Sequence, residues 1–570
     1  MRSVVQGAIA AFAALAVTAC ANQNTAGPRD GGPVAADRHM IAAAHPLAAE
    51  AGRDILRQGG SAVDAAIATQ LVLGLVEPQS SGIGGGAFML HYDGDSGEVA
   101  AFDGRETAPS DATERLFLQD DGTPMGFWDA VVGGRSVGVP GVLRMLEKAH
   151  AHHGELAWAR LFRPAIRLAR RGFEVTPRLH ALIARDRFLK TFAPARRYFY
   201  TDAGEPLPVG TRLRNPAYAD TLEAIAEGGA DAFYTGPIAH DIARTVQTAE
   251  GNPGLLTAAD IAGYEAKVRA PLCRGYRGRR VCGMPPPTSG GATTLQILGI
   301  LESFDLDLYP PMSAQATHLL AEASRLAFAD RNRYLADSDF VDVPLQRLLD
   351  DGYLAERAGL IETGVSLGQA EPGLARRQAA MPDQPSGAST SHFSIVDDRG
   401  NAVSMTSSVE QAFGSRLMVR GFMLNNQLTD FSFRPEVDGR PVANRVQPGK
   451  RPRSSMSPTI VTDADGGFRL AVGSPGGSRI IGFTTQRLLA VLDWQMDVRT
   501  ALALGNVVNR NGPTELEAGT RAADLAAQLR DWGHRVEVET MTSGLHAVAR
   551  RDDRLFGAAD PRREGVALGD

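Results

Sequence analysis

The chain has 570 residues, of which 44% are hydrophobic and 22% charged, and its formal net charge is −6. These values are typical of an ordinary soluble globular protein, and the acidic balance with scattered arginines argues against nucleic acid as a partner. The length would allow several domains, but no low-complexity linker divides the chain into independent units.

The first segment, residues 1–19, is predicted to be a bacterial lipoprotein signal peptide. Positive charge at Arg2 precedes an apolar run at residues 8–17 that is too short to span a bilayer, and Cys20 stands at the expected cleavage site. We therefore expect lipid on Cys20 and a tether over residues 20–40, with an ordinary signal peptide as the alternative. In the usual bacterial sorting pattern, an Asp directly after the lipidated Cys retains a lipoprotein at the inner membrane. Ala21 occupies that position here, which favours anchoring to the outer membrane with the enzyme in the periplasm.

Apolar residues at helical spacing predict a helix over residues 61–76, followed by a glycine cluster at 82–86 and a strand at 87–92. The glycine spacing, with Asp103 further on, resembles a dinucleotide-binding fingerprint. That fingerprint requires the order strand, loop, helix, so that phosphates meet a helix N-terminus. The order here is reversed, so the glycines indicate close backbone packing.

A histidine-rich stretch at residues 150–155 raises the question of a metal site. It lies at the end of a helical run over 142–150, beside Gly154, and residues 156–175 predict a further helix. Imidazoles near a glycine-capped helix C-terminus are a common solvated ending. The sequence therefore predicts no metal, and it gives no sign of a cofactor.

Cys273 and Cys282 flank a predicted hairpin that turns at Arg277 and Gly278, which would place the two cysteines directly opposite each other. An oxidising periplasm would permit a disulfide. Cross-strand pairs often have poor bridging geometry, so two reduced thiols remain an equal alternative.

The bond between Ser389 and Thr390 follows the longest loop-like stretch of the chain, residues 371–389. Self-cleavage there would make Thr390 an N-terminal residue. Its Oγ1 could then attack while its free α-amino group, of pKa ~7.7–8, accepts the proton. The loop is therefore interpreted as a processing linker.

Two strand-like segments, residues 393–396 and 402–406, follow Thr390 and are joined by a turn-like tetrapeptide at 398–401. If they pair as a hairpin, Ser408 lies opposite Thr390 or one residue away. The pattern thus places a second hydroxyl beside the candidate nucleophile.

Several long motifs in fixed order closely resemble the γ-glutamyltranspeptidase (glutathione hydrolase) family of N-terminal-nucleophile hydrolases. They lie at residues 60–66, 84–86, 105–109, 284–291, 390–394, 424–431, 451–459 and 473–479. The likeness runs from about Ala42 to about Gly565. It implies an α+β fold, a four-layer αββα sandwich built from two fragments of one self-cleaved chain. A large fragment, 41–389, and a small catalytic fragment, 390–570, would form a heterodimer.

The resemblance also implies the roles of individual residues. The backbone N–H groups of Gly476 and Gly477 would form the oxyanion hole, where a side chain would obstruct approach. A γ-glutamyl group carries an α-carboxylate and an α-ammonium, so its pocket needs both donors and an anion. The corresponding residues are Arg105, Ser454 and Ser455 for the carboxylate, and Gln427 and Asp430 for the ammonium.

Three departures from the family pattern bear on specificity. Ser408 replaces the Thr of many members, which keeps the hydroxyl. Glu410 replaces the Asn of many transpeptidases and could strengthen ammonium binding or repel the substrate carboxylate. Residues 433–450 are shorter than the lid loop of the well-known bacterial members and contain no Tyr. A reduced lid would leave the nucleophile open to water or bulky amides.

The resemblance implies a self-processing γ-glutamyl hydrolase/transferase that cleaves glutathione and related compounds through a γ-glutamyl-Thr390 acyl-enzyme. A glutaryl or cephalosporin acylase, whose substrate has no α-amino group, is the alternative within the fold. Asp430 and Gln427 favour the glutamyl function. A non-catalytic surface lipoprotein is a third hypothesis, and the presence of Thr390, Gly476 and Gly477 together argues against it.

Overall fold

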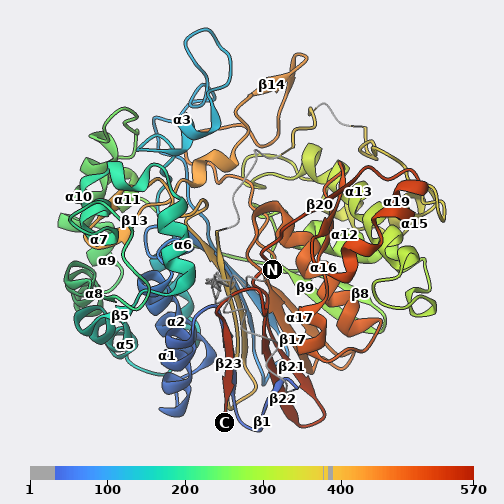
Figure 1. Ribbon diagram of the computed structural model, residues 1–570, viewed down its shortest axis with the longest axis horizontal. Coiled ribbons are helices and arrows are strands. Elements are labelled where there is room, and N and C mark those ends of the chain that lie inside the picture. The colour runs from blue at the N-terminus through green and yellow to red at the C-terminus, as the bar shows by residue number, and fades with distance from the viewer. Residues whose placement is uncertain (1–31, 376–377, 383–388) are drawn as a thin grey trace, which may run out of the picture. The chain divides into compact units, whose positions relative to one another are not determined.

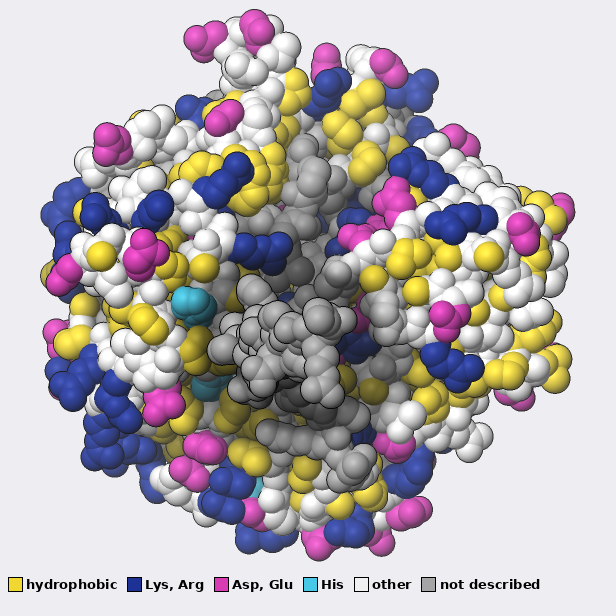
Figure 2. Space-filling model, viewed as in Figure 1, with side chains coloured by type: hydrophobic (Ala, Val, Ile, Leu, Met, Phe, Trp, Pro, Cys, Tyr) yellow, Lys and Arg dark blue, Asp and Glu magenta, His cyan; other side chains and the backbone are white. Residues whose placement is uncertain are grey.

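The protein is described by a computed structural model that covers residues 32–375, 378–382 and 389–570. The signal peptide, Cys20 and most of the predicted tether lie outside these residues. Within the described part of the chain, no helix combines the length and the apolar character needed to cross a membrane. On the face shown in Figure 2, basic and acidic side chains are interspersed.

Two seven-stranded antiparallel sheets lie face to face at the centre of the folded unit (Figure 1). The first sheet contains, in spatial order, β1 (Val34–Ala36), β22 (Arg554–Ala559), β21 (His546–Arg551), β17 (Phe468–Gly473), β16 (Thr459–Thr462), β9 (Arg279–Gly283) and β8 (Leu272–Tyr276). The second contains β23 (Val566–Gly569), β2 (Met40–Ala43), β10 (Ser391–Val396), β11 (Ala402–Ser408), β3 (Gly86–Tyr92), β4 (Val99–Gly104) and β7 (Lys267–Arg269).

Helices cover the outer face of each sheet (Figure 1). On the second sheet lie α1 (Pro46–Arg57), α2 (Ala62–Val76) and α4 (Val142–His153), with α5 (Trp158–Arg171) packed outside them. On the first sheet lie α12 (Gly290–Leu301), α16 (Ile480–Leu492) and α17 (Val498–Ala503), with α13 (Ala314–Tyr334) beyond α12. Apolar clusters fill all three interfaces, and the predicted four-layer αββα sandwich is confirmed.

The predicted helix at residues 61–76 is confirmed as α2. The Ser61 hydroxyl accepts the Asp64 N–H and the Asp64 carboxylate accepts the Ser61 N–H, so two otherwise unpaired N–H groups are satisfied. Every residue of α2 is buried, because the helix lies between the second sheet and α5. Such a helix needs no polar face.

The hairpin of β8 and β9 places Cys273 directly opposite Cys282, as predicted. The two sulfurs are bonded at 2.09 Å. Of the two alternatives, the structure therefore has the disulfide and not the pair of reduced thiols. Both cysteines precede Ser389 in the chain.

Two expectations need correction. The histidine-rich end of α4 is not simply solvated, because His150 hydrogen-bonds the Leu156 carbonyl at 2.8 Å and the His153 ring stacks on His91 at 3.8 Å. The end of the predicted tether also belongs to the fold, since β1 at residues 34–36 pairs with β22. Residues 34–36, which the predicted tether included, are therefore part of the first sheet.

Each sheet contains strands from both sides of the Ser389–Thr390 bond. In the second sheet, β10 and β11 lie between β2 and β3, and β23 pairs with β2 on the other edge. In the first, β9 pairs with β16 and β1 pairs with β22. The stretches before and after the bond thus share both sheets.

Candidate active site

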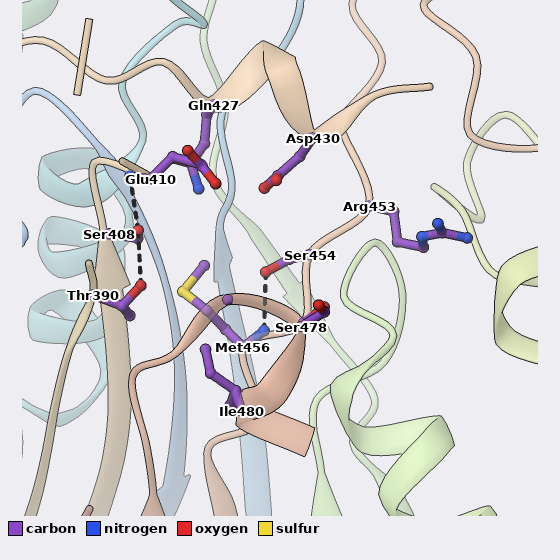
Figure 3. A pocket seen from close by; sticks show the side chains of 12 residues that line it. Thr390, Ser408, Glu410, Gln427, Asp430, Arg453, Ser454, Met456, Ser478 and Ile480 are labelled. Atoms are coloured by element: carbon purple, nitrogen blue, oxygen red, sulfur yellow. Dashed lines mark hydrogen bonds between the residues drawn. The ribbon is translucent and has the colours of Figure 1, made fainter. Parts of the chain in front are cut away.

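Thr390 lies at the start of β10, a central strand of the second sheet, and only 4% of its surface is exposed. The register of β10 with β11 pairs Ser391 with Ser407, so Thr390 faces Ser408. The Thr390 and Ser408 hydroxyl oxygens are 3.1 Å apart (Figure 3). The predicted position of Ser408 opposite Thr390 is confirmed.

The Ser389 carbonyl lies against both hydroxyls in the uncut chain. Thr390 Oγ1 donates to this carbonyl at 2.8 Å, and Ser408 Oγ lies 3.2 Å from it. The Glu410 backbone N–H donates to Ser408 Oγ at 2.8 Å, which fixes the orientation of that side chain. The attacking oxygen of a self-cleavage reaction and the carbonyl it must attack are therefore already in contact.

The glycine cluster before β3 explains how Ser408 is held. A Cβ on Gly85 would approach the Ser408 carbonyl to 2.1 Å, and a Cβ on Gly84 would approach the Met423 carbonyl equally closely. No side chain fits at either distance. The prediction of close backbone packing, in the order helix, loop, strand, is confirmed.

Polar side chains continue along the same face of β10 and β11, between the two sheets. His392 hydrogen-bonds Thr406 at 2.8 Å and Ser394 at 3.1 Å, and the Ser394 hydroxyl donates to the His546 carbonyl in the first sheet. Burial lowers the pKa of His392 well below its ordinary value, so its imidazole is neutral. His392 thus fixes the strands and is not a charged partner of Thr390.

Gly476 and Gly477 lie at the N-terminal end of α16, where helix N–H groups lack partners within the helix. Both have positive φ, +139° and +59°, and a Cβ on Gly476 would lie 2.7 Å from the Phe483 ring. Glycine is therefore required at Gly476 by conformation and by space. Gly477 lines the same pocket as Thr390, whereas Gly476 is not part of its lining.

The pocket beside Thr390 has a volume of about 30 Å³. Glu410, Gln427 and Asp430 form one wall, with the Ser454 and Ser478 side chains across from them (Figure 3). The complete lining is Thr390, Ser408, Glu410, Gln427, Asp430, Arg453, Ser454, Ser455, Met456, Gly477, Ser478 and Ile480. Residues 433–450, the expected short lid, contribute nothing to this lining.

Arg105 does not lie where it was expected, in forked contact with the site of a substrate carboxylate. It is fully buried and does not line the pocket. Its Nη2 contacts Asp430 at 2.5 Å and its Nε donates to the Pro452 carbonyl at 3.0 Å. Arg105 Nη1 has no hydrogen-bond partner among the described residues. The guanidinium therefore holds Asp430 from behind the pocket wall.

Two buried carboxyl groups adjoin this ion pair. Burial raises the pKa of Glu106 to about 8, although the adjacent Arg105 opposes the rise. Burial and the neighbouring Asp430 raise the pKa of Glu410 to about 8 as well. Near neutral pH both groups are protonated, so Arg105 and Asp430 carry the local charges. Sequence reasoning missed Glu106, although it directly follows Arg105.

The remaining predicted site residues all line the pocket. Gln427 Oε1 is a buried acceptor with no hydrogen-bond partner among the described residues. Ser454 Oγ accepts the Met456 N–H at 3.1 Å, and Ser455 Oγ accepts from Arg331 at 2.7 Å. Arg331, on α13, was not anticipated, because nothing local in the sequence joins it to Ser455.

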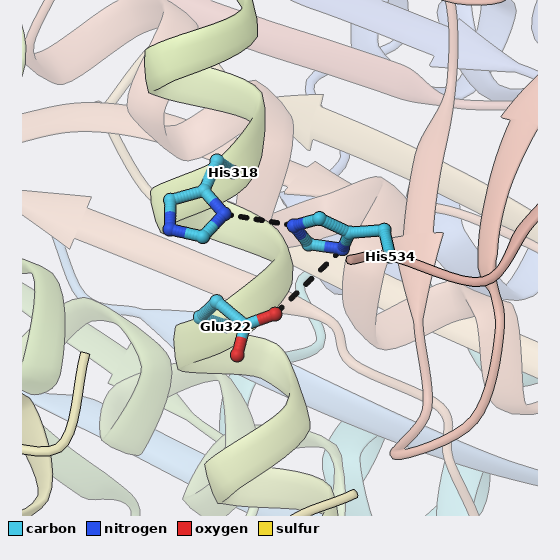
Figure 4. A group of neighbouring side chains, drawn as sticks. All are labelled: His318, Glu322 and His534. Atoms are coloured by element: carbon cyan, nitrogen blue, oxygen red, sulfur yellow. Dashed lines mark hydrogen bonds and ion pairs between the residues drawn. The ribbon is translucent and has the colours of Figure 1, made fainter. Parts of the chain in front are cut away.

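Among the described residues, one group has side chains suited to a metal, namely His318, Glu322 and His534 (Figure 4). The two imidazoles hydrogen-bond each other at 2.7 Å, and their outer nitrogens contact the Glu362 carbonyl and the Thr514 hydroxyl at 2.9 Å. All four ring nitrogens are thus satisfied without an ion. We assign the group to packing of α13 against the strands near Thr514.

A four-layer αββα sandwich with a hydroxyl residue at the head of a central strand defines an N-terminal-nucleophile hydrolase. The family model described as gamma-glutamyltranspeptidase matches residues 48–570. The chain therefore belongs to the γ-glutamyltranspeptidase family.

Relatives and solved structures agree with this family. The glutathione hydrolase proenzyme of Escherichia coli is 39% identical over 548 residues, covering 93% of this chain and 91% of its own. The acylase ACY 1 proenzyme of Pseudomonas sp. strain SE83 is 35% identical and covers 94% of each chain. The structure of cephalosporin acylase from Bacillus halodurans superimposes with a TM-score of 0.84 at 29% identity, covering 96% of this chain and 98% of that one.

Proposed function

We propose that Thr390 is the nucleophile of this self-processing γ-glutamyl hydrolase/transferase, and that glutathione-like γ-glutamyl amides are its substrates. The observation that carries the assignment is the contact of Thr390 Oγ1 with both the Ser389 carbonyl and Ser408 in a pocket bearing Asp430 and Gln427. Glutathione hydrolase proenzymes among its relatives support the same substrate class.

Processing would begin with attack of Thr390 Oγ1 on the Ser389 carbonyl carbon. The bond to the Thr390 nitrogen breaks, the hydroxyl proton passes to that nitrogen, and an ester joins Ser389 to Thr390 Oγ1. Water then hydrolyses the ester. The products are a Ser389 carboxylate and a free Thr390 amine, with Ser408 Oγ placed to donate to the developing oxyanion.

In the cut enzyme, the Thr390 α-amino group would accept the proton as Oγ1 attacks the γ-carbonyl carbon of the substrate. The amine of the substrate leaves with a proton, and the γ-glutamyl group remains as an ester on Thr390. We assign the oxyanion to the N–H groups of Gly476 and Gly477. Loss of one such donor typically raises the barrier by ~2.7–4 kcal/mol.

Substrate recognition is assigned to the two sides of the pocket. Asp430 and the unpartnered Gln427 Oε1 would receive the α-ammonium, with Glu410 beside them. The carboxylate would meet the hydroxyls of Ser454 and Ser455. Arg105 contributes by holding Asp430 from behind the pocket wall.

A glutaryl or cephalosporin acylase remains the second candidate, because acylases are among the similar proteins. Such substrates carry no α-ammonium. The three oxygen-bearing side chains of Glu410, Gln427 and Asp430 on one wall favour the glutamyl group. Turnover of matched γ-glutamyl and glutaryl anilides by the purified enzyme separates the two functions, and preference for the glutaryl compound would reverse the assignment.

Thr390→Ala tests the nucleophile. We expect one uncut chain with no activity, because the attacking oxygen of both reactions is gone, whereas Thr390→Ser should still be cut. Intact mass spectrometry and a γ-glutamyl anilide assay on the same samples give both readouts. Cleavage of Thr390→Ala between residues 389 and 390 would contradict the assignment.

We also propose a periplasmic location with a lipid anchor at Cys20, on sequence grounds alone. Stable anchoring needs more than one acyl chain, as in a multiply acylated bacterial lipoprotein Cys. Cys20→Ser should release active enzyme into the soluble periplasmic fraction or stall its export, as fractionation would show. A wild-type protein that is already soluble, with its N-terminus cut elsewhere, would remove the anchor from the proposal.

A further inference from the structure

The short loop at residues 433–450 ends on a lysine, Lys450, whose side chain is fully buried. The Lys450 ammonium donates to the Ala443 carbonyl at 2.7 Å and to the Arg445 carbonyl at 3.1 Å. It also donates to the side-chain oxygen of Gln447 at 3.0 Å. An ammonium has three N–H donors, so all three are used within this one loop. The cation therefore holds the loop closed around itself.

The residue between the two bound carbonyls is Asn444, which is only 2% exposed. Its Nδ2 donates to the Asp430 carbonyl at 2.7 Å, and its Oδ1 accepts the Arg453 N–H at 2.9 Å. Both ends of the amide are thus engaged, which fixes the orientation of the side chain. Because Lys450 holds the carbonyls on either side of Asn444, it also fixes the backbone from which this amide extends.

The two partners of Asn444 belong to different sides of the pocket beside Thr390. Asp430 lies on one wall, and Ser454, the residue that follows Arg453, lies across from it (Figure 3). One amide side chain therefore connects the backbone of both sides. Asn444 itself is not part of the pocket lining, so it has no contact of its own with a bound acyl group.

We infer that Lys450 and Asn444 are positioning residues that set the spacing between the two walls of the γ-glutamyl pocket. The inference rests on the proposed function, which assigns the α-ammonium to Asp430 and the α-carboxylate to Ser454. These two substrate groups are a fixed distance apart, so both can be bound only if the walls are held to within about 0.5 Å. The loop expected to be a reduced lid thus supports the pocket without covering it.

This role predicts a particular kinetic effect. The α-ammonium and the α-carboxylate are unchanged by acyl transfer, so their contacts contribute equally to the bound substrate and to the transition state. Loss of such uniform binding raises KM and leaves kcat nearly unchanged. A variant that is merely less stable behaves differently, because a smaller active fraction lowers the apparent kcat at an unchanged KM.

The test measures kcat and KM for γ-glutamyl p-nitroanilide in wild type, Asn444→Ala, Lys450→Met and Arg440→Gln. The assay is run at pH 6.5, where Lys450 is protonated, because burial lowers its pKa only to about 7. Arg440 is the matched control, since it is exposed on β15 (Arg440–Pro441) of the same loop. We expect KM to rise about tenfold in Asn444→Ala and Lys450→Met, with kcat within about twofold of wild type. Arg440→Gln should match wild type in both constants.

Each other outcome has a defined meaning. If Lys450→Met yields no soluble protein, Asn444→Ala decides, because it leaves the lysine contacts in place. An unchanged KM in Asn444→Ala, with or without a fall in kcat, overturns the positioning role while Thr390 remains the nucleophile. An equal rise of KM in Arg440→Gln overturns it as well, since any change to the loop would then suffice. A wild type that does not turn over the anilide would instead overturn the proposed function itself.

Discussion

At the scale of single residues, Glu410 is the most unusual side chain of the site. Its backbone φ is +79°, which is uncommon outside glycine, and its carboxylate accepts a hydrogen bond from Asn426 at 2.9 Å. It lies on the wall with Gln427 and Asp430, across from Ser454 (Figure 3). This placement favours contact with the substrate ammonium over contact with its carboxylate.

Above about pH 8, where the Glu410 carboxylate is ionised, Glu410→Asn should therefore weaken γ-glutamyl substrates and hardly affect glutaryl ones. A charge-assisted contact is typically worth ~1.5–3 kcal/mol, so we expect about a tenfold or larger loss of kcat/KM. The measurement is kcat/KM of wild type and variant on matched γ-glutamyl and glutaryl anilides. Equal effects on both substrates would refute a role in recognising the α-amino group.

The raised pKa of Glu410 adds a pH dependence. The group is neutral below about pH 8 and becomes an anion above it, because burial and Asp430 disfavour the charge. The preference of the wild type for γ-glutamyl over glutaryl anilide should therefore increase as pH rises through about 8. Glu410→Asn should lose this increase, and a parallel rise in the variant would assign the titration to another group.

At the scale of elements, three short strands, β18 (Val507–Asn509), β19 (Thr514–Glu517) and β20 (Val536–Glu539), pack near α13 through buried histidines. Burial lowers the pKa of His534 to about 4. The unfolded chain binds this proton below about pH 6.5, whereas the folded protein does not bind it until about pH 4. Stability therefore falls as pH decreases through that window.

We expect the melting temperature to drop between pH 7.5 and pH 5, and His534→Gln should reduce that drop. Between pH 6.5 and pH 5 the unfolded chain gains a proton that the folded protein does not, so the contribution of His534 to the drop is about 2 kcal/mol. His240→Gln is the control, because His240 is exposed on α10 (Gly236–Gln247) and contacts only a backbone carbonyl of its own helix. An equal drop in His534→Gln and wild type would contradict the prediction.

Sequence patterns sufficed for elements built from neighbouring residues. The helix at 61–76, the Cys273–Cys282 hairpin and the pairing of Ser408 with Thr390 each depend on local periodicity or on one turn. The direction of Arg105 could not be predicted, since Asp430 lies 325 residues away. Arg331 was missed for the same reason, because it lies on α13 and reaches Ser455 from a separate segment.

At the scale of the whole molecule, the disulfide and the sheets have different roles in holding two fragments together. Cys273 and Cys282 both precede Ser389, so their bond does not join the fragments. The shared sheets do, because β10 and β11 are hydrogen-bonded to β2 and β3. The processed protein should therefore be held together without any covalent link.

We expect both fragments of the processed enzyme to elute as one species from a sizing column under native conditions. In a denaturing gel without reductant they should separate into two bands, since the disulfide lies within one fragment. Cys273→Ser should leave that two-band pattern unchanged. A single band that resolves only after reduction would contradict the disulfide assignment.

Because each sheet contains strands of both fragments, folding and cleavage must also occur in a fixed order. Neither fragment alone can complete a sheet, and each would expose unpaired strand edges that invite aggregation. Ser408 reaches the Ser389 carbonyl and the Thr390 hydroxyl only after β11 has paired with β10. Folding must therefore precede the cut. A chain that misfolds cannot cut itself, so it never gains its catalytic amine and never becomes an active hydrolase.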